Sequence, residues 1–230
     1  MENTPAPPGG PAKASPISLG PGWLLFAALA LAIPLAALAV HARREPPAQP
    51  LPVFSALPDF ALVDEAARPF SRKDLLGRAW VVDFIFTSCP DACPRLTAIM
   101  KQLQDSLTSE ERQGAVGLLS ISVDPARDTP AVMQAYARAR GADARVWRFL
   151  TGEQGAIERT VIEGFKSAIE KVELEAPQGE PHAQLMRILH GEKFVLVDAA
   201  GRIRGYYDVR DALEQQRLLR DLRQLLRGDS

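Results

Sequence analysis

The sequence contains little cysteine and histidine, with two cysteines and three histidines in 230 residues. Two cysteines cannot build a disulfide framework, and a structural zinc site ordinarily requires four Cys or His ligands at closer spacing. No basic run alternates with aromatic residues, and the formal net charge of −1 gives no general attraction to nucleic acid. These shortages argue against a disulfide scaffold, a zinc finger and a nucleic-acid-binding protein. The length and the 47% hydrophobic content suffice for one well-buried domain and an additional segment.

Charge is missing altogether from residues 23–40, WLLFAALALAIPLAALAV. Eighteen uncharged residues are about enough to cross a bilayer, so we expect a transmembrane anchor here. A disordered head rich in Pro, Gly and Ser precedes it over residues 1–22. A cleaved signal peptide is the alternative, because Ala37 and Ala39 have the spacing of a cleavage site. One lysine before the segment and two arginines after it slightly favour a cytoplasmic location for the rest of the chain.

Residues 41–58 contain five prolines, which predicts an extended, polyproline-like stalk. Residues 59–227 then predict one α/β domain, because strand-like apolar runs alternate with segments of helical periodicity. This alternation predicts a mixed sheet flanked by helices in a thioredoxin-like arrangement. We expect strands over residues 59–63, 79–86, 118–123, 146–150, near 165–173, and over 194–198 and 202–207. We expect helices after Cys93, from Pro130 to Gly141, over 152–162 and at the C-terminus.

Two of the expected helices begin with capping signals. Asp128 or Thr129 precedes Pro130, and proline is favoured in the first turn of a helix. Thr151 is followed three residues later by Gln154, which is the spacing of a capping box. These signals predict where both helices start.

Cys89 and Cys93 lie four residues apart, and Pro90 and Pro94 follow them directly. We expect Cys89 at the end of the strand over 79–86 and Cys93 in the first turn of the next helix, with the two sulfurs facing each other. The free N–H groups and the dipole at a helix start lower thiol pKa values, which predicts two thiolate-prone sulfurs. Such a pair can exchange a disulfide, or hold a soft metal such as Cu(I) or zinc with one ligand missing.

The missing ligand would be a histidine or another soft donor. His41 lies at the edge of the anchor, and His182 lies in a loop rich in Pro and Gly. His190 precedes the strand over 194–198, and in a thioredoxin-like sheet this loop lies next to the one with the cysteines. His190 is therefore the first candidate, His182 the second, and Met186 a further soft donor.

Three separated motifs occur in a recognisable order. Phe84–Thr87 leads into Cys89–Pro94, Ser122–Pro130 follows, and Leu189–His190 leads to Phe194–Asp198 with a glycine turn. Over about residues 55–226 the chain thereby resembles the Sco/SenC family of copper-binding, membrane-anchored, thioredoxin-like proteins. The family commonly has Ser or Thr after the histidine, where this chain has Gly191. That difference predicts altered loop stiffness with copper binding retained.

The resemblance implies that copper, as Cu(I), Cu(II) or both, binds Cys89, Cys93 and His190. It implies a metallochaperone for the dinuclear copper A site of cytochrome c oxidase subunit II, which delivers copper, reduces the recipient's cysteines, or does both. It also implies a single-pass protein of the cell membrane with its domain on the exported, periplasmic or extracytoplasmic side. Asp124 is a candidate further ligand for Cu(II), although its segment has the composition of an ordinary strand-to-helix turn.

Other classes remain open from the residues alone. A membrane-anchored thiol-disulfide oxidoreductase needs Cys89 and Cys93 as a redox pair and does not need His190. A copper or redox sensor would use the same labile site to signal to a partner. A peroxidase is disfavoured, because Thr87 and Arg95 near Cys89 are accounted for by a cap and a solvated charge.

Overall fold

The computed structural model describes residues 30–33, 49–165 and 192–228. The chain divides into two compact units, residues 1–48 and 49–230. In the first unit only residues 30–33 are described, and they are helical. The expected head and most of the expected anchor over 23–40 lie outside the described residues. The described helices include none that is long and apolar enough to cross a membrane.

Strands and helices alternate through the second unit, as the hydrophobic pattern predicts. The strands are β1 Ser55–Ala56, β2 Ala61–Asp64, β3 Pro69–Ser71, β4 Ala79–Ile85, β5 Val116–Ser122, β6 Trp147–Thr151, β7 Lys193–Val197 and β8 Arg202–Asp208. The helices are α2 Ala92–Ser106, α3 Pro130–Ala139, α4 Gln154–Glu158 and α7 Ala212–Leu226. Shorter helical turns are η1 Arg72–Leu75, η2 Glu111–Ala115 and η3 Arg159–Gly164.

The strands form one mixed sheet in the order β1-β8-β7-β4-β5-β6-β2-β3. The central strands β4, β5 and β6 are parallel, whereas β7 pairs antiparallel with β4, and β8 pairs antiparallel with β7. Parallel neighbours need helical crossovers, and α2 and α3 supply them after β4 and β5. The carboxyl ends of β4 and β5 therefore meet at one edge of the sheet, where the cysteine segment begins.

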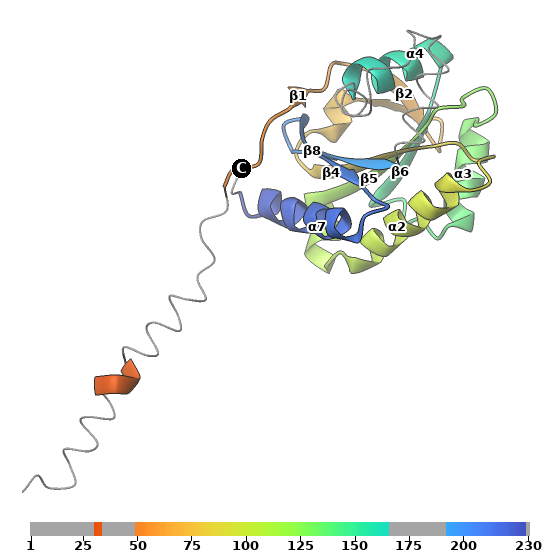
Figure 1. The fold of residues 1–230 in the computed structure, drawn as a ribbon. Coiled ribbons are helices and arrows are strands. Elements are labelled where there is room, and N and C mark those ends of the chain that lie inside the picture. The colour runs from red at the N-terminus through yellow and green to blue at the C-terminus, as the bar shows by residue number, and fades with distance from the viewer. Residues whose placement is uncertain (1–29, 34–48, 166–191, 229–230) are drawn as a thin grey trace, which may run out of the picture. The chain divides into compact units, whose positions relative to one another are not determined.

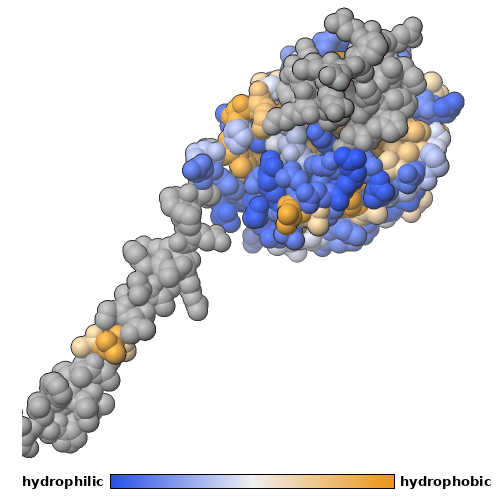
Figure 2. Space-filling model, in the orientation of Figure 1, coloured by the Kyte–Doolittle hydropathy of each residue, from blue (hydrophilic) through white to orange (hydrophobic). Residues whose placement is uncertain are grey.

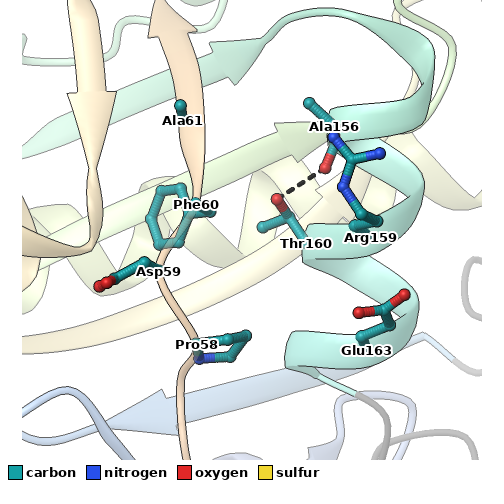
Figure 3. A pocket seen from close by; sticks show the side chains of 8 residues that line it. All are labelled: Pro58, Asp59, Phe60, Ala61, Ala156, Arg159, Thr160 and Glu163. Carbon is teal, nitrogen blue, oxygen red and sulfur yellow. Dashed lines mark hydrogen bonds between the residues drawn. The ribbon is translucent and has the colours of Figure 1, made fainter.

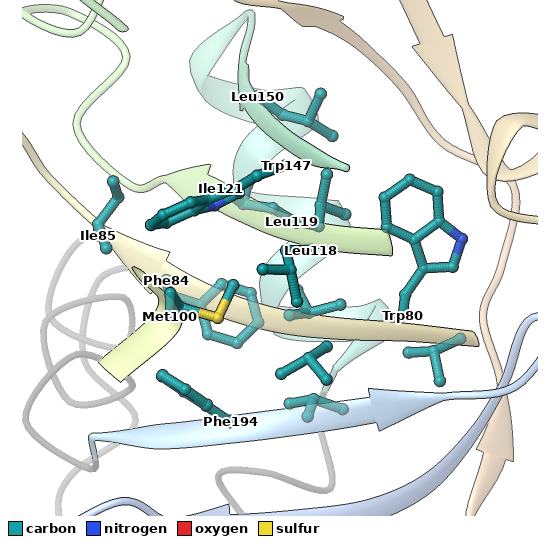
Figure 4. Close-up of a cluster of buried hydrophobic side chains, with 14 of the residues drawn as sticks. Trp80, Phe84, Ile85, Met100, Leu118, Leu119, Ile121, Trp147, Leu150 and Phe194 are labelled. Atoms are coloured by element: carbon teal, nitrogen blue, oxygen red, sulfur yellow. The ribbon is translucent and has the colours of Figure 1, made fainter. Parts of the chain in front are cut away.

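The core lies on both faces of the central strands (Figure 4). Every residue of β4 and β5 is buried, which explains why these two strands are continuous apolar runs with only a few polar residues. Trp80 of β4 lies over Gly117 of β5, and a Cβ at position 117 would be 2.4 Å from the Trp80 ring. Only glycine fits there, so this close approach fixes how β4 and β5 pack.

Helices cover the sheet on both sides (Figure 1). Helices α2 and α7 lie on one face, and α4 lies on the other. Helix α3 is joined to α2 by a hydrogen bond of 2.8 Å between Thr97 Oγ1 and Tyr136 Oη. Figure 2 shows that the described surface in view is largely hydrophilic, with smaller apolar areas, as expected when the apolar faces point inward. This layered α/β architecture confirms the predicted mixed sheet flanked by helices.

The expected stalk over residues 41–58 differs from the structure at its C-terminal end. Ser55 and Ala56 form β1, which pairs antiparallel with β8. The buried Arg204 guanidinium donates hydrogen bonds to the carbonyl oxygens of Leu51 and Pro52, at 2.6 and 3.0 Å. The folded unit therefore begins well before residue 59, because a buried arginine needs these carbonyl acceptors.

The predicted helix starts have different outcomes. Thr129 caps α3, since its Oγ1 accepts from the Val132 N–H, and Pro130 occupies the first turn. The predicted capping box of Thr151 and Gln154 is wrong. Thr151 ends β6 with its hydroxyl buried, and α4 starts after Glu153 without a side-chain cap. Of the strand expected near 165–173, only residue 165 is described, and it is not in a strand.

Candidate metal centre

The cysteine segment follows the carboxyl end of β4. The Cys89 N–H donates to the Phe86 carbonyl at 3.2 Å, which turns the chain immediately after the strand. Cys93 is the second residue of α2, and its N–H donates to Cys89 Sγ at 3.4 Å. Both cysteines are free thiols. The structure thus confirms that the two predicted sulfur donors lie together at the start of a helix.

The two thiols differ in burial and acidity. Cys89 is half-buried, and although burial opposes its ionisation, the N–H groups of Cys93, Asp91 and Ala92 and the Cys93 thiol hold its pKa below the ordinary value. Cys93 is 1% exposed, and burial together with the neighbouring Cys89 and Asp83 raises its pKa well above the ordinary value. The prediction of two thiolate-prone sulfurs is therefore wrong for Cys93. The helix start activates the exposed thiol, whereas burial keeps the inner thiol protonated.

Asp128 holds the segment before the cysteines in place. Its carboxylate is fully buried and accepts hydrogen bonds from the Thr87 N–H at 3.0 Å, the Thr87 hydroxyl and the Ser122 hydroxyl at 2.6 Å. Thr87 lies two residues before Cys89, so the turn after β5 fixes the start of the cysteine segment. The motif over residues 122–130 thus holds the start of the cysteine segment in place, and the Thr87 hydroxyl donates its hydrogen bond to Asp128.

A bidentate ion pair joins α2 to the start of β7. Arg95 Nη2 lies 2.6 Å from Glu192 Oε1, and Arg95 Nε lies 3.0 Å from Glu192 Oε2. The Glu192 side chain is 10% exposed, and its backbone has a φ of +43°, which non-glycine residues rarely adopt. Arg95 is exposed, as the sequence predicts, and in addition it is ion-paired with Glu192. It holds Glu192 beside the helix that starts with the cysteines.

The remaining predicted donors, His182, Met186 and His190, lie outside the described residues, as does Gly191. Within the residues that the structure describes, no group of three or more His, Cys, Asp or Glu side chains is placed to hold a metal ion. Asp124 is therefore not grouped with the two cysteines, and its carboxylate instead accepts from Arg127 at 3.0 Å. The described part of the site is a two-sulfur centre.

A buried carboxylate lies on the strand that leads to the cysteines. Asp83 of β4 is fully buried, accepts a 2.6 Å hydrogen bond from the Ser120 hydroxyl, and has no partner for Oδ2 among the described residues. Burial raises its pKa to about 7, although the hydrogen bond from Ser120 by itself lowers the pKa. Trp147 donates to the same Ser120 hydroxyl at 3.0 Å. In the sequence, this buried carboxyl group is indicated by the one aspartate inside the otherwise apolar run AWVVDFIF.

A hollow on the other face of the sheet is separate from the cysteines (Figure 3). It measures about 410 Å³. Residues 58–61, which lead into β2, line one side of it, and the α4–η3 segment lines the other. The Thr160 hydroxyl that faces it donates to the Ala156 carbonyl at 2.7 Å. Its charged lining residues are Asp59, Arg159 and Glu163, and its described lining contains no sulfur or imidazole donor. The two cysteines are not among its described lining residues.

Two adjacent thiols can perform two kinds of chemistry. They can be oxidised together to a disulfide, with loss of two electrons and two protons. They can also supply two soft ligands to Cu(I), which accepts low coordination numbers with sulfur donors. The polar N–H groups around Cys89 favour its thiolate, which is the reactive form in either case.

Comparison with known proteins agrees with this arrangement. The SCO1/SenC family model matches residues 50–227. The SCO1 protein homolog of Bacillus subtilis is 33% identical over 145 residues, which cover 63% of this chain and 69% of that protein. Other curated relatives are matched over between 25% and 42% of their own length.

Solved structures of Sco proteins are similar to this chain as well. A SCO1/SenC family lipoprotein from Bacillus anthracis has 28% identity and a TM-score of 0.60, covering 77% of this chain and 99% of that one. BsSco, described with a disulfide switch and as a member of a family of cytochrome c oxidase assembly proteins, has 26% identity and a TM-score of 0.58. That match covers 76% of this chain and 96% of BsSco. The chain therefore belongs to the SCO1/SenC family.

Proposed function

We propose that this protein binds copper through Cys89, Cys93 and His190 and delivers it during assembly of the copper A site of cytochrome c oxidase subunit II. The two sulfur donors lie together at the start of α2. Copper(I) with two thiolates and one imidazole has the soft and borderline ligands that it prefers. Delivery of copper requires a site that releases the ion, and a half-exposed Cys89 gives a partner's thiols direct access.

The Arg95–Glu192 ion pair is the observation that carries the three-ligand proposal. Arg95 lies two residues after Cys93, and Glu192 lies two residues after His190. Two peptide units span at most about 7 Å between Cα atoms, so the ion pair limits how far His190 can be from α2. This constraint supports a shared site for Cys89, Cys93 and His190, although they are a hundred residues apart along the chain.

Family membership supports the proposed partner and place. BsSco is described as belonging to a family of cytochrome c oxidase assembly proteins, and the B. anthracis relative is a lipoprotein. We infer that this chain also works at a membrane, with residues 23–40 as its anchor and its domain on the exported side. The recipient copper A site lies on that side of the membrane in this proposal. Transfer would then take place between two proteins held at the same surface.

Copper titration of the full chain in a neutral detergent tests the proposal. The reduced protein is expected to bind one copper ion, and Cys89→Ser, Cys93→Ser and His190→Ala are each expected to lose tight binding. His182→Ala is the matched control and should retain it. In cells, deletion of the gene should leave subunit II without its copper, while the His182→Ala protein should restore it. Full metal loading of the oxidase in the deletion strain would contradict the delivery role.

A thiol-disulfide oxidoreductase is the second candidate, and the free, adjacent thiols of Cys89 and Cys93 favour it. In this reaction the Cys89 thiolate attacks a disulfide of the recipient, and Cys93 then displaces the recipient's second thiol. The recipient gains two electrons and two protons, and the protein is left with a Cys89–Cys93 disulfide. This activity does not need His190. If the His190→Ala protein still reduces a disulfide but no longer binds copper, then copper binding needs His190 and disulfide reduction does not.

A further inference from the structure

A basic hollow lies at the end of the sheet opposite the cysteines. It measures about 440 Å³ and is lined by Arg78, Ser109, Arg112, Gln113, Gly114 and Arg145. We call it the amino-end pocket. Arg78 directly precedes β4, Gly114 precedes β5 in η2, and Arg145 precedes β6. Because these three strands are parallel, their amino ends meet at one edge of the sheet and bring the three arginines together.

Each arginine is held by a different contact that leaves donor groups available. Arg112 Nε and Nη2 donate to the carbonyl oxygens of Leu107 and Asp105, both at 3.0 Å. Arg78 lies over the Trp80 ring at 5.3 Å and forms no ion pair within the described residues. Contacts to carbonyls and to an aromatic ring orient a guanidinium without cancelling its charge.

The acidic groups nearby are not among the residues that line the pocket. In the described part of the chain, Arg145 is the one of the three that forms a salt bridge, with Nη2 2.6 Å from Asp143 Oδ2, and Arg112 also interacts electrostatically with the Asp105 and Asp143 carboxylates. The Asp105 carboxylate is engaged by Lys101 at 2.5 Å. The Glu111 carboxylate accepts the Thr108 N–H at 2.6 Å, and none of the described lining residues is acidic. The described lining therefore carries three guanidinium groups and no carboxylate, so the wall of the hollow is positively charged.

A glycine with a positive φ forms part of the pocket lining. Gly114 has a φ of +138°, and a Cβ built there would meet nothing within 4 Å. The glycine is required at the kink inside η2, since L residues rarely adopt this conformation. The neighbouring Ser109 and Gln113 side chains add a hydroxyl and an amide to the lining. The pocket therefore combines positive charge with neutral hydrogen-bond donors.

We propose that the amino-end pocket binds a phosphate group, either as inorganic phosphate or as the phosphate monoester of a lipid headgroup. Guanidinium groups recognise the tetrahedral oxygens of phosphate with paired N–H donors, and several of them suit a dianion better than a monovalent ion. The seven residues of β4 separate Arg78 from the cysteine segment by roughly 20 Å. Binding at this pocket is therefore independent of the proposed copper function.

Calorimetric titration of the full chain in a neutral, phosphate-free detergent solution tests this assignment. Inorganic phosphate is the first probe, dihexanoyl phosphatidic acid below its micelle concentration is the second, and dihexanoyl phosphatidylcholine is the control lipid. We expect saturable binding of phosphate, and binding of phosphatidic acid but not phosphatidylcholine if the headgroup is the natural ligand. Equal affinity for phosphate and phosphatidic acid would identify the free ion as sufficient. Heat that sodium chloride reproduces at equal ionic strength would overturn the proposal.

Substitutions locate the binding. Arg78→Gln combined with Arg145→Gln removes two charges without removing a hydrogen bond to a backbone carbonyl, so this protein should fold. It should bind phosphate at least about tenfold more weakly, whereas Arg220→Gln on the exposed side of α7 should bind it unchanged. Arg112→Gln should also weaken binding, with a fall in stability from the two lost carbonyl contacts. Unchanged phosphate affinity in the double variant would place the ion elsewhere and contradict the proposal.

Discussion

The Arg95 guanidinium and the Glu192 carboxylate face each other in a bidentate ion pair, with Nη2 2.6 Å from Oε1 and Nε 3.0 Å from Oε2. The pair joins residues 97 positions apart, on α2 and at the start of β7. It holds Glu192 in a left-handed backbone conformation that is uncommon for a side chain of this size. The residues two positions after Cys93 and two positions after His190 are thereby connected by described side chains.

Breaking this pair should weaken copper binding. Arg95→Gln removes the charge that holds Glu192, so the segment before Glu192 becomes less restricted. The proposed ligand in that segment, His190, is then less well positioned for the metal. We expect the copper affinity of the reduced protein to fall by about tenfold, the lower range for loss of a group that orients a metal ligand. A competition titration with a Cu(I) chelator measures this change.

The ion pair of Arg217 and Glu214 on α7 provides a matched control, because it joins residues of one helix far along the chain from the cysteines. Arg217→Gln should leave copper affinity unchanged. Exchanging the charges, with Arg95→Glu and Glu192→Arg together, should recover part of the lost affinity. Equal affinity in the wild-type and Arg95→Gln proteins would show that the ion pair has no part in the site.

Replacing Asp128 should destabilise the fold and loosen the cysteine segment. Asp128→Ala leaves the partly buried Thr87 N–H and hydroxyl and the buried Ser122 hydroxyl without their acceptor. We expect a loss of about 2–4 kcal/mol in the free energy of unfolding, since three donors lose one fully buried acceptor. Urea denaturation measures it. Alkylation of Cys89 should also become faster, because Thr87 no longer fixes the chain before it.

Asp124→Asn is the control for Asp128. Asp124 pairs with Arg127, whose side chain is 74% exposed, so its loss should cost less than about 1 kcal/mol. If Asp128→Ala unfolds at the same urea concentration as Asp124→Asn, the buried carboxylate does not support the segment as described.

The buried Asp83 should make stability depend on pH. Its pKa in the folded state is about 7, above the ordinary value of 3.8. The folded state therefore binds the proton more tightly, and the stability from this group is complete below about pH 4 and lost as pH rises to 7. Asp83→Asn stays neutral throughout. The difference in unfolding free energy between variant and wild type should grow by up to about 4 kcal/mol from pH 4 to pH 8.

Two titratable neighbours of Asp83 do not disturb this comparison. The Cys93 thiol and the Tyr136 hydroxyl interact with Asp83, and burial raises the pKa of both, so each stays protonated over this range. Urea denaturation at several pH values provides the measurement. Parallel stability curves for the wild-type and Asp83→Asn proteins would show that Asp83 ionises as readily in the folded as in the unfolded chain.

The two thiols should react at different rates. Cys89 is half-buried with a lowered pKa, whereas Cys93 is 1% exposed with a raised one. Iodoacetamide should therefore modify Cys89 at least about tenfold faster than Cys93 near pH 7, as followed by peptide mass spectrometry. The Cys93→Ser protein should keep most of the fast phase, and the Cys89→Ser protein should lose it. Preferential modification of Cys93 would contradict the assigned burial.

Much of the fold could be predicted from local sequence pattern. The apolar run AWVVDFIF is β4, the alternation around Ser120 and Ser122 is β5, and the leucine stripe near the C-terminus is α7. These elements are long and strongly patterned, so tertiary contacts only reinforce them. The two-residue strand β1 was missed, because its pairing with β8 and its contact to Arg204 depend on residues far along the chain.

The two neighbouring thiols could be predicted from the sequence, and their surroundings less so. The spacing of Cys89 and Cys93 correctly predicts neighbouring thiols, because it depends on local geometry. The acidity of Cys93 was mispredicted, because the helix-start argument omits the desolvation of a buried sulfur. The Arg95–Glu192 pair could not be read from one sequence, since a charge pattern does not show partners from different elements. The position of His190 stays a prediction.

Copper binding by the His190→Ala protein tests the central claim most directly. The full chain is purified reduced in neutral detergent, and its copper content and Cu(I) affinity are compared among wild type, His190→Ala and His182→Ala. We predict one copper per chain for wild type and His182→Ala, and at least about a hundredfold weaker binding for His190→Ala, with Cys89–Cys93 oxidation retained. Wild-type affinity in the His190→Ala protein would contradict the three-ligand site.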